Sequence, residues 1–406
     1  MVELWFLSVQ LHGLSRLSGA YSLVIVAATA ACLLMHLRRR VPPDVFVWVT
    51  ANVLVLGYVI WIDTFVSRAL PSPGNIVRVT TPFAIAIVMA LSVRSLTQVA
   101  RLSIVYLAVA TLGALSLYYQ IAFGPVAWFA DASSRSGVTR YATLLGSLTI
   151  FGTAAPFALL CLARYVKPAV PFAVGAVLLG VAAMFSLQKA AIAGMAIAAP
   201  FIVLLARPRG LFLTVGLSLI GGMTAIQLVP PQYLPYLEAG IRYVLREQSD
   251  DFSIMESIVD RLVMLPGKVV DFVGWDSLIA GAGLRGAGGV FGFDDLPMAH
   301  NGLVDYVAVG GVLFFAYGTW VCARVAWFGI SLPWMVRREL MSRDDALFLG
   351  GMALLYLANL PFASGVQFHP NISWVFAMII AVQMALRESV QDERIGQLTP
   401  SGQAAS

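Results

Sequence analysis

The chain has 406 residues, of which 59% are hydrophobic and 12% are charged, whereas soluble domains carry about 25% charged residues. This composition excludes an ordinary soluble protein, because a soluble core could not bury so many apolar side chains. The net charge of +5 does not by itself indicate nucleic-acid binding, since membrane proteins concentrate Lys and Arg in their cytoplasmic loops. The three cysteines are far apart in apolar stretches, which predicts neither a disulfide framework nor a thiolate metal site.

Apolar runs long enough to span a bilayer recur along the chain, and such a span needs about 20 residues. They cover residues 19–36, 45–62, 76–93, 102–121, 141–162, 169–186, 190–206, 210–228, 302–325, 345–362 and 372–387. Residues 1–17 are either an interfacial helix or a twelfth, short span. The sequence therefore predicts an all-α, polytopic membrane protein with about 11–12 transmembrane helices.

The distribution of basic residues predicts the orientation. Fifteen of the 26 Lys and Arg residues lie in alternate loops, which are therefore predicted to be cytoplasmic. This orientation divides the chain into a bundle of about eight spans (1–228), a long extracytoplasmic loop (229–300), three further spans (301–387) and a disordered cytoplasmic tail (388–406). The long loop is predicted to carry short amphipathic helices along the membrane surface.

Ten basic residues remain on the outer side or in outward helix ends: Arg68, Arg78, Arg135, Arg140, Lys189, Arg242, Arg246, Arg261, Lys268 and Arg285. Because they oppose the topological bias, an anionic ligand such as a diphosphate is expected there. Arginine suits this ligand, since its planar guanidinium binds phosphate oxygens in a bidentate fork. The alternative is that individual members only face water or lipid headgroups.

His300 and Asn301 stand at the boundary between the long loop and the next span. Histidine has a pKa near neutrality and can take a proton from a sugar hydroxyl, while Asn301 could orient the ring or the substrate. A helix cap or a headgroup contact is the alternative role.

A glycine-rich segment precedes this histidine. Residues 281–286, GAGLRG, could offer backbone N–H groups to a phosphate beside Arg285, or could simply be flexible. The chain has no Walker loop and no Cys/His cluster, so neither a metal nor another cofactor is expected.

The segment LIAGAGLRGAGG…DLPMAHNGLVDYVAVGGVLFF resembles the O-antigen ligase and polymerase superfamily. These bacterial membrane enzymes move glycans from an undecaprenyl diphosphate carrier. The resemblance centres on His300 and Asn301, with Arg261 at the position of an upstream family arginine. The motif glycines that it implies are Gly281, Gly283 and Gly311.

This resemblance implies an inverting, metal-independent glycosyltransferase of the bacterial inner membrane, with its active site on the periplasmic side and a cytoplasmic C-terminus. His300 would deprotonate the acceptor hydroxyl. The diphosphate would be bound by Arg261, Arg135, Arg140 and Arg285, with Lys189, Arg242 and Arg246 as further candidates.

The acceptor is either another lipid-linked glycan, which makes the enzyme a polymerase of O-antigen or exopolysaccharide, or the lipid A core, which makes it a ligase. Phe314, where ligases tend to carry Gly, Thr or Tyr, and the Arg135-x10-Gly146 match favour the polymerase. Expected partners are the lipid-linked oligosaccharide, the acceptor glycan, the bilayer, a chain-length regulator and other glycan-export proteins, but no nucleic acid. A lipid-linked oligosaccharide flippase is the alternative from another class.

Overall fold

The computed structural model describes residues 2–11, 14, 19–36, 43–66, 84–126, 132–135, 138–146, 150–228, 231–236, 238–239, 264, 267, 279–283, 302–360 and 370–398. Within these residues the fold is all-α, apart from one small two-stranded hairpin. The predicted fold class is confirmed at that level.

The helices follow the apolar runs of the sequence closely. In chain order they are α1 (Val2–Gln10), α2 (Gly19–His36), α3 (Pro43–Trp61), the π-helix η2 (Ile62–Val66), a helix over residues 84–92, α5 (Leu96–Phe123), α6 (Ile150–Tyr165), α7 (Ala169–Phe185), α8 (Lys189–Leu205), α9 (Pro208–Leu228), the 3₁₀ turn η3 (Pro231–Tyr233), α15 (Gly302–Arg337), α16 (Arg343–Asn359) and α17 (Pro370–Leu398). The hairpin consists of β1 (Ala132–Arg135) and β2 (Val138–Tyr141).

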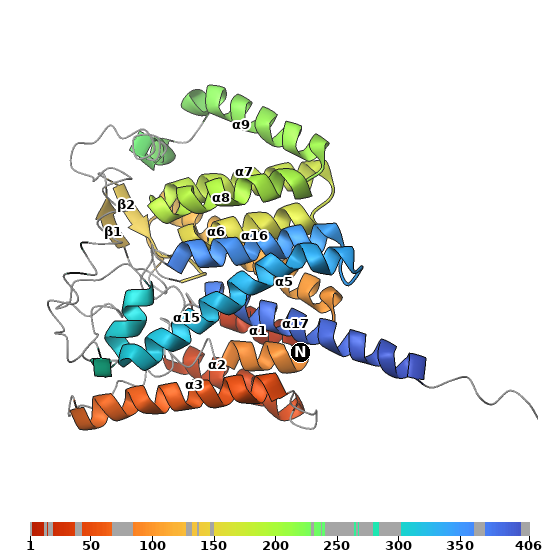
Figure 1. The fold of residues 1–406 in the computed structure, drawn as a ribbon. Helices are drawn as coiled ribbons and strands as arrows, with labels where there is room; N and C mark the ends of the chain where they lie inside the picture. Colours follow the sequence, from red (N-terminus) through yellow and green to blue (C-terminus); the bar gives the residue numbers. More distant parts are fainter. Residues whose placement is uncertain are drawn as a thin grey trace, which may run out of the picture.

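The helices stack in successive layers around α6 (Figure 1). Helix α9 forms one outer side and α3 the other, and α15 crosses obliquely between them. Every residue from Ile150 to Ala163 of α6 is buried, and α6 contacts α5, α7, α8 and α16. The glycine and alanines of this helix leave room for the close approach of neighbouring helices, which is how helices commonly pack in membranes.

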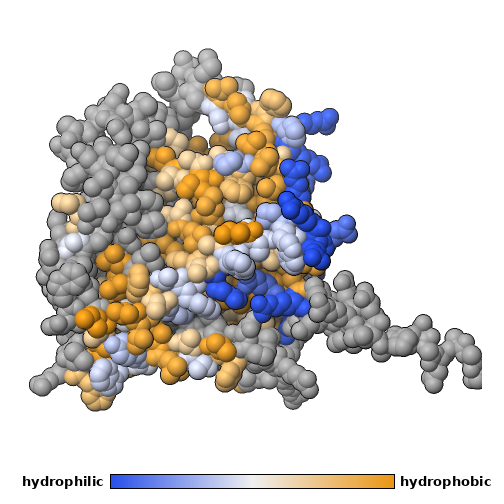
Figure 2. Space-filling model, viewed as in Figure 1, coloured by the Kyte–Doolittle hydropathy of each residue, from blue (hydrophilic) through white to orange (hydrophobic). Residues whose placement is uncertain are grey.

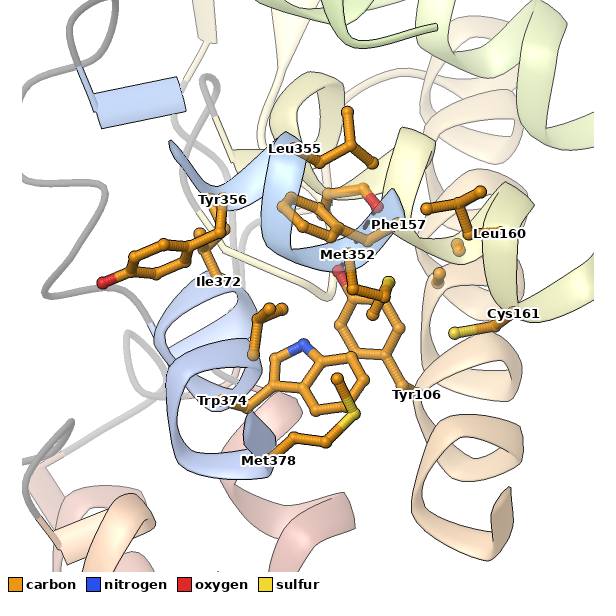
Figure 3. Close-up of a cluster of buried hydrophobic side chains, with 14 of the residues drawn as sticks. Tyr106, Phe157, Leu160, Cys161, Met352, Leu355, Tyr356, Ile372, Trp374 and Met378 are labelled. Atoms are coloured by element: carbon orange, nitrogen blue, oxygen red, sulfur yellow. Dashed lines mark hydrogen bonds between the residues drawn. The ribbon is translucent and has the colours of Figure 1, made fainter. Parts of the chain in front are cut away.

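An aromatic pair fixes the centre of the core, where α5, α6, α16 and α17 meet (Figure 3). The rings of Tyr106 and Trp374 lie 4.8 Å apart, and both residues are almost fully buried. Their polar atoms are satisfied by one carbonyl oxygen, that of Asn371, which lies 3.0 Å from the Tyr106 hydroxyl and 3.1 Å from Trp374 Nε1. Buried aromatic residues usually find such partners, so the pair fixes how α5 and α17 pack.

One end of the bundle gathers charged side chains (Figure 2). Arg164, at the end of α6, donates from Nη2 and Nε to Asp345 Oδ1 at 2.8 and 3.1 Å. Asp345 lies in the first turn of α16, where Ser342 accepts a hydrogen bond from its backbone N–H as the N-cap. Lys167 Nζ lies 3.4 Å from the carbonyl oxygen of Leu205, at the end of α8. The ends of α6 and α8 therefore meet the start of α16 here.

The exposed surface next to this charged end is largely apolar (Figure 2). Among the described residues, two helices are long and apolar enough to cross a membrane, Leu96–Phe123 and Tyr306–Arg337. Six shorter apolar helical segments of 10–17 residues accompany them.

Three predicted boundaries differ most from the structure. The expected span 141–162 begins only with α6 at Ile150, because residues up to 141 pair in β2 and residues 143–146 form a tight turn. Helix α15 continues beyond the expected residue 325 to Arg337. Helix α17 continues to Leu398, so residues 388–398 are not the predicted disordered tail; good helix formers such as Glu, Gln and Arg extend it.

The N-terminal helix α1 packs against the bundle with one face. Its nine residues rise about 13.5 Å at 1.5 Å per residue, which is less than half of a hydrocarbon core about 30 Å thick. Trp5 and Phe6 are buried, and Phe6 packs edge to face on Trp374. The described helix alone is therefore too short to cross the bilayer; residues 12–13 and 15–17 lie outside the described residues, so both expectations for residues 1–17 stay predictions.

Candidate functional site

Helix α15 is interrupted eight residues after it begins. Gly310 has φ −130° and ψ 20°, and Gly311 has φ 60° and ψ −151°. The second pair of angles lies in a region that is essentially restricted to glycine. The interruption separates a short first half from a long second half, and it leaves carbonyl groups of the first half without helical partners.

The loop Ile279–Gly283 fills this interruption. The backbone N–H of Ala282 donates to the carbonyl oxygen of Ala308 at 2.8 Å, which satisfies one of those carbonyl groups. Gly281, with φ 90°, lies so close that a Cβ atom there would come within 2.7 Å of Gly310 Cα and Gly311 N. Conversely, a Cβ atom on Gly311 would overlap the carbonyl oxygen of Ile279. Two backbones are therefore in direct contact, with no space for a side chain between them.

The loop and the interruption together hold the three glycines that the sequence singles out: Gly281 contacts Gly311 directly, and Gly283 lies two residues further along the loop. Gly281 and Gly283 come from the GAGLRG segment, and Gly311 follows about thirty residues later. All three have positive φ angles and all three are buried. The three glycines thus lie in one local structure.

The end of α3 contacts the same loop. Tyr58 Oη donates to the carbonyl oxygen of Ala280 at 2.8 Å. Asp63, in the π-helix η2, is completely buried, and its Oδ1 occupies the space that a Cβ atom on Gly283 would need. Sequence reasoning missed both residues. The available signal was a single acidic residue at the end of an otherwise apolar run. In membrane proteins such a residue commonly has a functional role.

The predicted catalytic residues border this contact in the sequence. His300 and Asn301 lie outside the described residues, as do Arg261, Arg285, Arg242 and Arg246. The described chain resumes at Gly302, the buried first residue of α15.

The hairpin carries two of the predicted basic residues. Strands β1 and β2 are antiparallel, with Arg135 opposite Val138 and Ser133 opposite Arg140. Positions 135 and 140 therefore lie on the same face of the hairpin, since opposite residues and residues two apart share a face. Gly146, the glycine of the Arg-x10-Gly match, lies in the turn after β2, where Thr143 and Gly146 exchange backbone hydrogen bonds.

An aromatic cluster fastens the hairpin to the helices. Tyr236 is buried and donates its hydroxyl hydrogen to the carbonyl oxygen of Thr139 in β2, while its ring lies 5.9 Å from that of Phe185 at the end of α7. Tyr233 donates to the carbonyl oxygen of Tyr118 at 2.9 Å. Burial raises the pKa of Tyr236, so its phenol remains a neutral donor.

Lys189 begins α8 at the same end of the bundle. It follows the buried residues Ser186 and Gln188, which separate it from Phe185 and the aromatic cluster. A Cβ atom on Gly152 of α6 would come within 2.6 Å of Gln188 Oε1, so this turn packs directly on the central helix. Three of the ten outer basic positions, 135, 140 and 189, are thus at one end.

Several buried polar side chains also lie at this end. Gln120, near the end of α5, donates from Nε2 to the carbonyl oxygen of Ala142 at 2.7 Å. Asn371, in the first turn of α17, donates from Nδ2 to the carbonyl oxygen of Leu145. Both amides therefore hold the turn that follows the hairpin. Among the described residues, no group of three His, Cys, Asp or Glu side chains is placed to hold a metal ion.

Comparisons with known proteins do not assign the chain to a family. No protein-family model matches it, and no curated protein matches it either.

Proposed function

We propose that this chain is a membrane-embedded, metal-independent glycosyltransferase. It transfers a glycan from an undecaprenyl diphosphate carrier to an acceptor sugar hydroxyl on the periplasmic face of the bacterial inner membrane. The observation that carries this proposal is the contact of the loop that holds Gly281 and Gly283 with the interruption of α15 at Gly311. These glycines belong, together with His300, to the pattern that resembles the O-antigen ligase and polymerase superfamily, and their place in one local structure supports the resemblance for the part of the pattern that the structure describes.

The surface of the molecule supports a polytopic arrangement. Side chains on the outward sides of several helices are large, apolar and exposed, as in Leu54, Phe123 and Phe212. The charged residues gather where α6, α8, α15 and α16 turn (Figure 2). A basic end of this kind is typical of the cytoplasmic side of a multi-pass protein, so the hairpin and the glycine contact would face the periplasm.

The proposed reaction is a single displacement at the anomeric carbon. His300 takes the proton of the acceptor hydroxyl, whose oxygen forms the new bond to the anomeric carbon as the bond to the diphosphate oxygen breaks. The electron pair of the broken bond leaves with the lipid diphosphate, and the configuration at the anomeric carbon is inverted. Arginines such as Arg135 and Arg140, which share a hairpin face, stabilise the developing negative charge. Asn301 orients the base or the acceptor.

Within this class we favour a polymerase over a ligase. Phe314 is fully buried and packs edge to face on Tyr306 at 4.7 Å, close to the interruption of α15. Phe at the position where ligases tend to carry Gly, Thr or Tyr is a departure from the ligase pattern and supports a different acceptor. The ligase, with lipid A core as acceptor, remains the second candidate.

A transporter of lipid-linked oligosaccharides is the candidate from another class. The interruption of α15 supports it, because broken helices beside buried polar groups are common at transporter binding sites. The two classes differ in one observable, since only the enzyme forms a new glycosidic bond.

The test uses purified protein in detergent with a polyprenyl-diphosphate-linked oligosaccharide as both donor and acceptor. We expect dimeric and longer products from the wild type. His300→Ala should abolish them, with His36→Ala as the matched histidine control, and Arg140→Ala should reduce them at least tenfold, with the exposed Arg209→Ala as the arginine control. A His300→Ala variant with full activity contradicts the mechanism. Transport of the lipid without product would support the transporter.

A further inference from the structure

Asp63 is a fully buried acidic residue beside exposed aromatic side chains. It is 0% exposed, whereas the nearby Trp61 and Phe65 are 50% and 67% exposed. In the proposed membrane setting the end of α3 and the following η2 direct aromatic rings toward lipid and the carboxylate of Asp63 toward the protein. Acidic residues within membrane helices commonly have a functional role.

The position of this carboxylate is unusual in the backbone as well. Asp63 lies in a five-residue π-helix, Ile62–Val66, which directly follows α3. Such π-helical turns are rare and occur frequently at functional sites. The altered turn occurs where the chain brings a polar side chain inward.

Asp63 faces the loop Ile279–Gly283. Its Oδ1 lies where any side chain on Gly283 would begin, and Tyr58 on the same helix donates to the carbonyl oxygen of Ala280 at 2.8 Å. The loop in turn donates from Ala282 N–H to the interrupted helix α15. Tyr58 of α3 and Asp63 of η2 therefore hold the loop at two points, and the loop in turn contacts the interruption of α15.

We propose that Asp63 is a positioning residue for glycosyl transfer. It fixes the loop Ile279–Gly283 against the break in α15, and so sets the geometry of the two chain segments that lead to the predicted catalytic residues. One segment continues from Gly283 to Arg285, and the other begins α15 at Gly302, directly after His300 and Asn301. This inference rests on the proposed function and adds α3 to a site that the sequence assigns to residues 261–311.

The chemical role of the carboxylate follows from its place. The carboxylate contacts the loop at Gly283, so its removal should alter the orientation of catalytic groups rather than the affinity for the lipid donor. A change in orientation lowers kcat and leaves KM nearly unchanged. A residue that only stabilises the fold would instead lower the amount of folded protein and leave the kinetic constants of the remainder unchanged.

The experiment compares Asp63→Asn, which keeps the size of the side chain, with Thr64→Val as the control. Thr64 is the adjacent residue of the same π-helix, and its hydroxyl only bonds back to Ile60 O at 2.8 Å. Each variant is measured for kcat and KM with the lipid-linked donor, and for hydrogen exchange of the peptide that contains residues 279–283. We expect Asp63→Asn to lower kcat at least tenfold with KM within twofold, and to accelerate exchange at Ala282.

Gly283→Ala perturbs the contact between Asp63 and Gly283 from the side of the loop and keeps the carboxylate of Asp63. It should reproduce both effects, and it serves as the test if Asp63→Asn does not fold. Unchanged kcat and unchanged exchange in these variants would overturn the inference. Faster exchange with unchanged kcat would also overturn it, because the loop would then be held without consequence for catalysis. If the wild type forms no product, the proposed function fails, whereas the exchange measurement still reports whether Asp63 holds the loop.

Discussion

Replacing Gly311 with alanine should damage the protein far more than an ordinary glycine substitution. Gly311 has φ 60° and ψ −151°, a conformation that costs other residues about 1–3 kcal/mol. The new methyl group would also overlap the carbonyl oxygen of Ile279 and lie 2.7 Å from Ala280 C. These are backbone atoms, so no change of side-chain rotamer can relieve the overlap. Overpacking of this kind costs a further 1–3 kcal/mol or so.

The two contributions together predict a loss of about 2–6 kcal/mol in the free energy of unfolding. The measurement is SDS-induced unfolding in mixed micelles, followed by tryptophan fluorescence, together with glycosyl transfer at matched protein concentration. We expect transfer to be abolished even under conditions in which the variant remains folded, because the loop can relieve the overlap only by moving away from α15.

Gly180→Ala is the matched control. Gly180 lies within α7, and a Cβ atom there would have no neighbour within 4 Å. Alanine is favoured over glycine in a helix by up to about 1 kcal/mol, so this variant should be as stable as the wild type or slightly more stable, with full activity. Equal stability and equal activity of the Gly311→Ala and Gly180→Ala variants would refute the backbone contact described here.

Three further predictions follow from the two ends of the bundle. Tyr236→Phe removes the hydroxyl that holds β2 and should raise KM for the diphosphate-linked donor severalfold with little change in melting temperature, measured by steady-state kinetics and thermal melting. Arg164→Ala should lower the free energy of unfolding by about 1–2 kcal/mol, because it leaves the partly buried Asp345 without its main partner; addition of Asp345→Ala should restore part of this loss. In a variant without native cysteines, a membrane-impermeant maleimide added to intact spheroplasts should label Gln232→Cys but not Arg209→Cys, and the reverse pattern would invert the proposed topology.

The positions of most helices could be predicted from hydropathy alone. For instance, the expected run 169–186 corresponds to α7, Ala169–Phe185, and the run 210–228 to α9, Pro208–Leu228. The start of α6 could not be predicted this way. The hydropathy of residues 141–149 is close to that of a membrane-spanning helix. However, Tyr141 pairs with Ala132 in the hairpin, and residues 143–146 form a turn. Both features depend on contacts with other residues, which a hydropathy average does not include.

The site could be predicted only in part. Its glycines stand out because their spacing resembles a family pattern, whereas the contact between Gly281 and Gly311 depends on two segments about thirty residues apart. Asp63 belongs to a helix more than two hundred residues earlier, and one carboxylate in an apolar run does not stand out in a sequence with 21 acidic residues. Its importance becomes visible only when Gly283 is found against it.

The interruption of α15 and the loop that fills it depend on each other. A break within a helix leaves carbonyl groups without partners, and an unsatisfied buried carbonyl costs about 1–3 kcal/mol. The N–H of Ala282 satisfies the carbonyl group of Ala308, so the break is stable only while the loop is in place. The loop can approach only because both backbones carry glycine at the contact, at Gly281 and at Gly311. Loss of either glycine should therefore have the same consequence as loss of the loop, and the double variant should be little worse than either single variant, since all of them remove one shared contact.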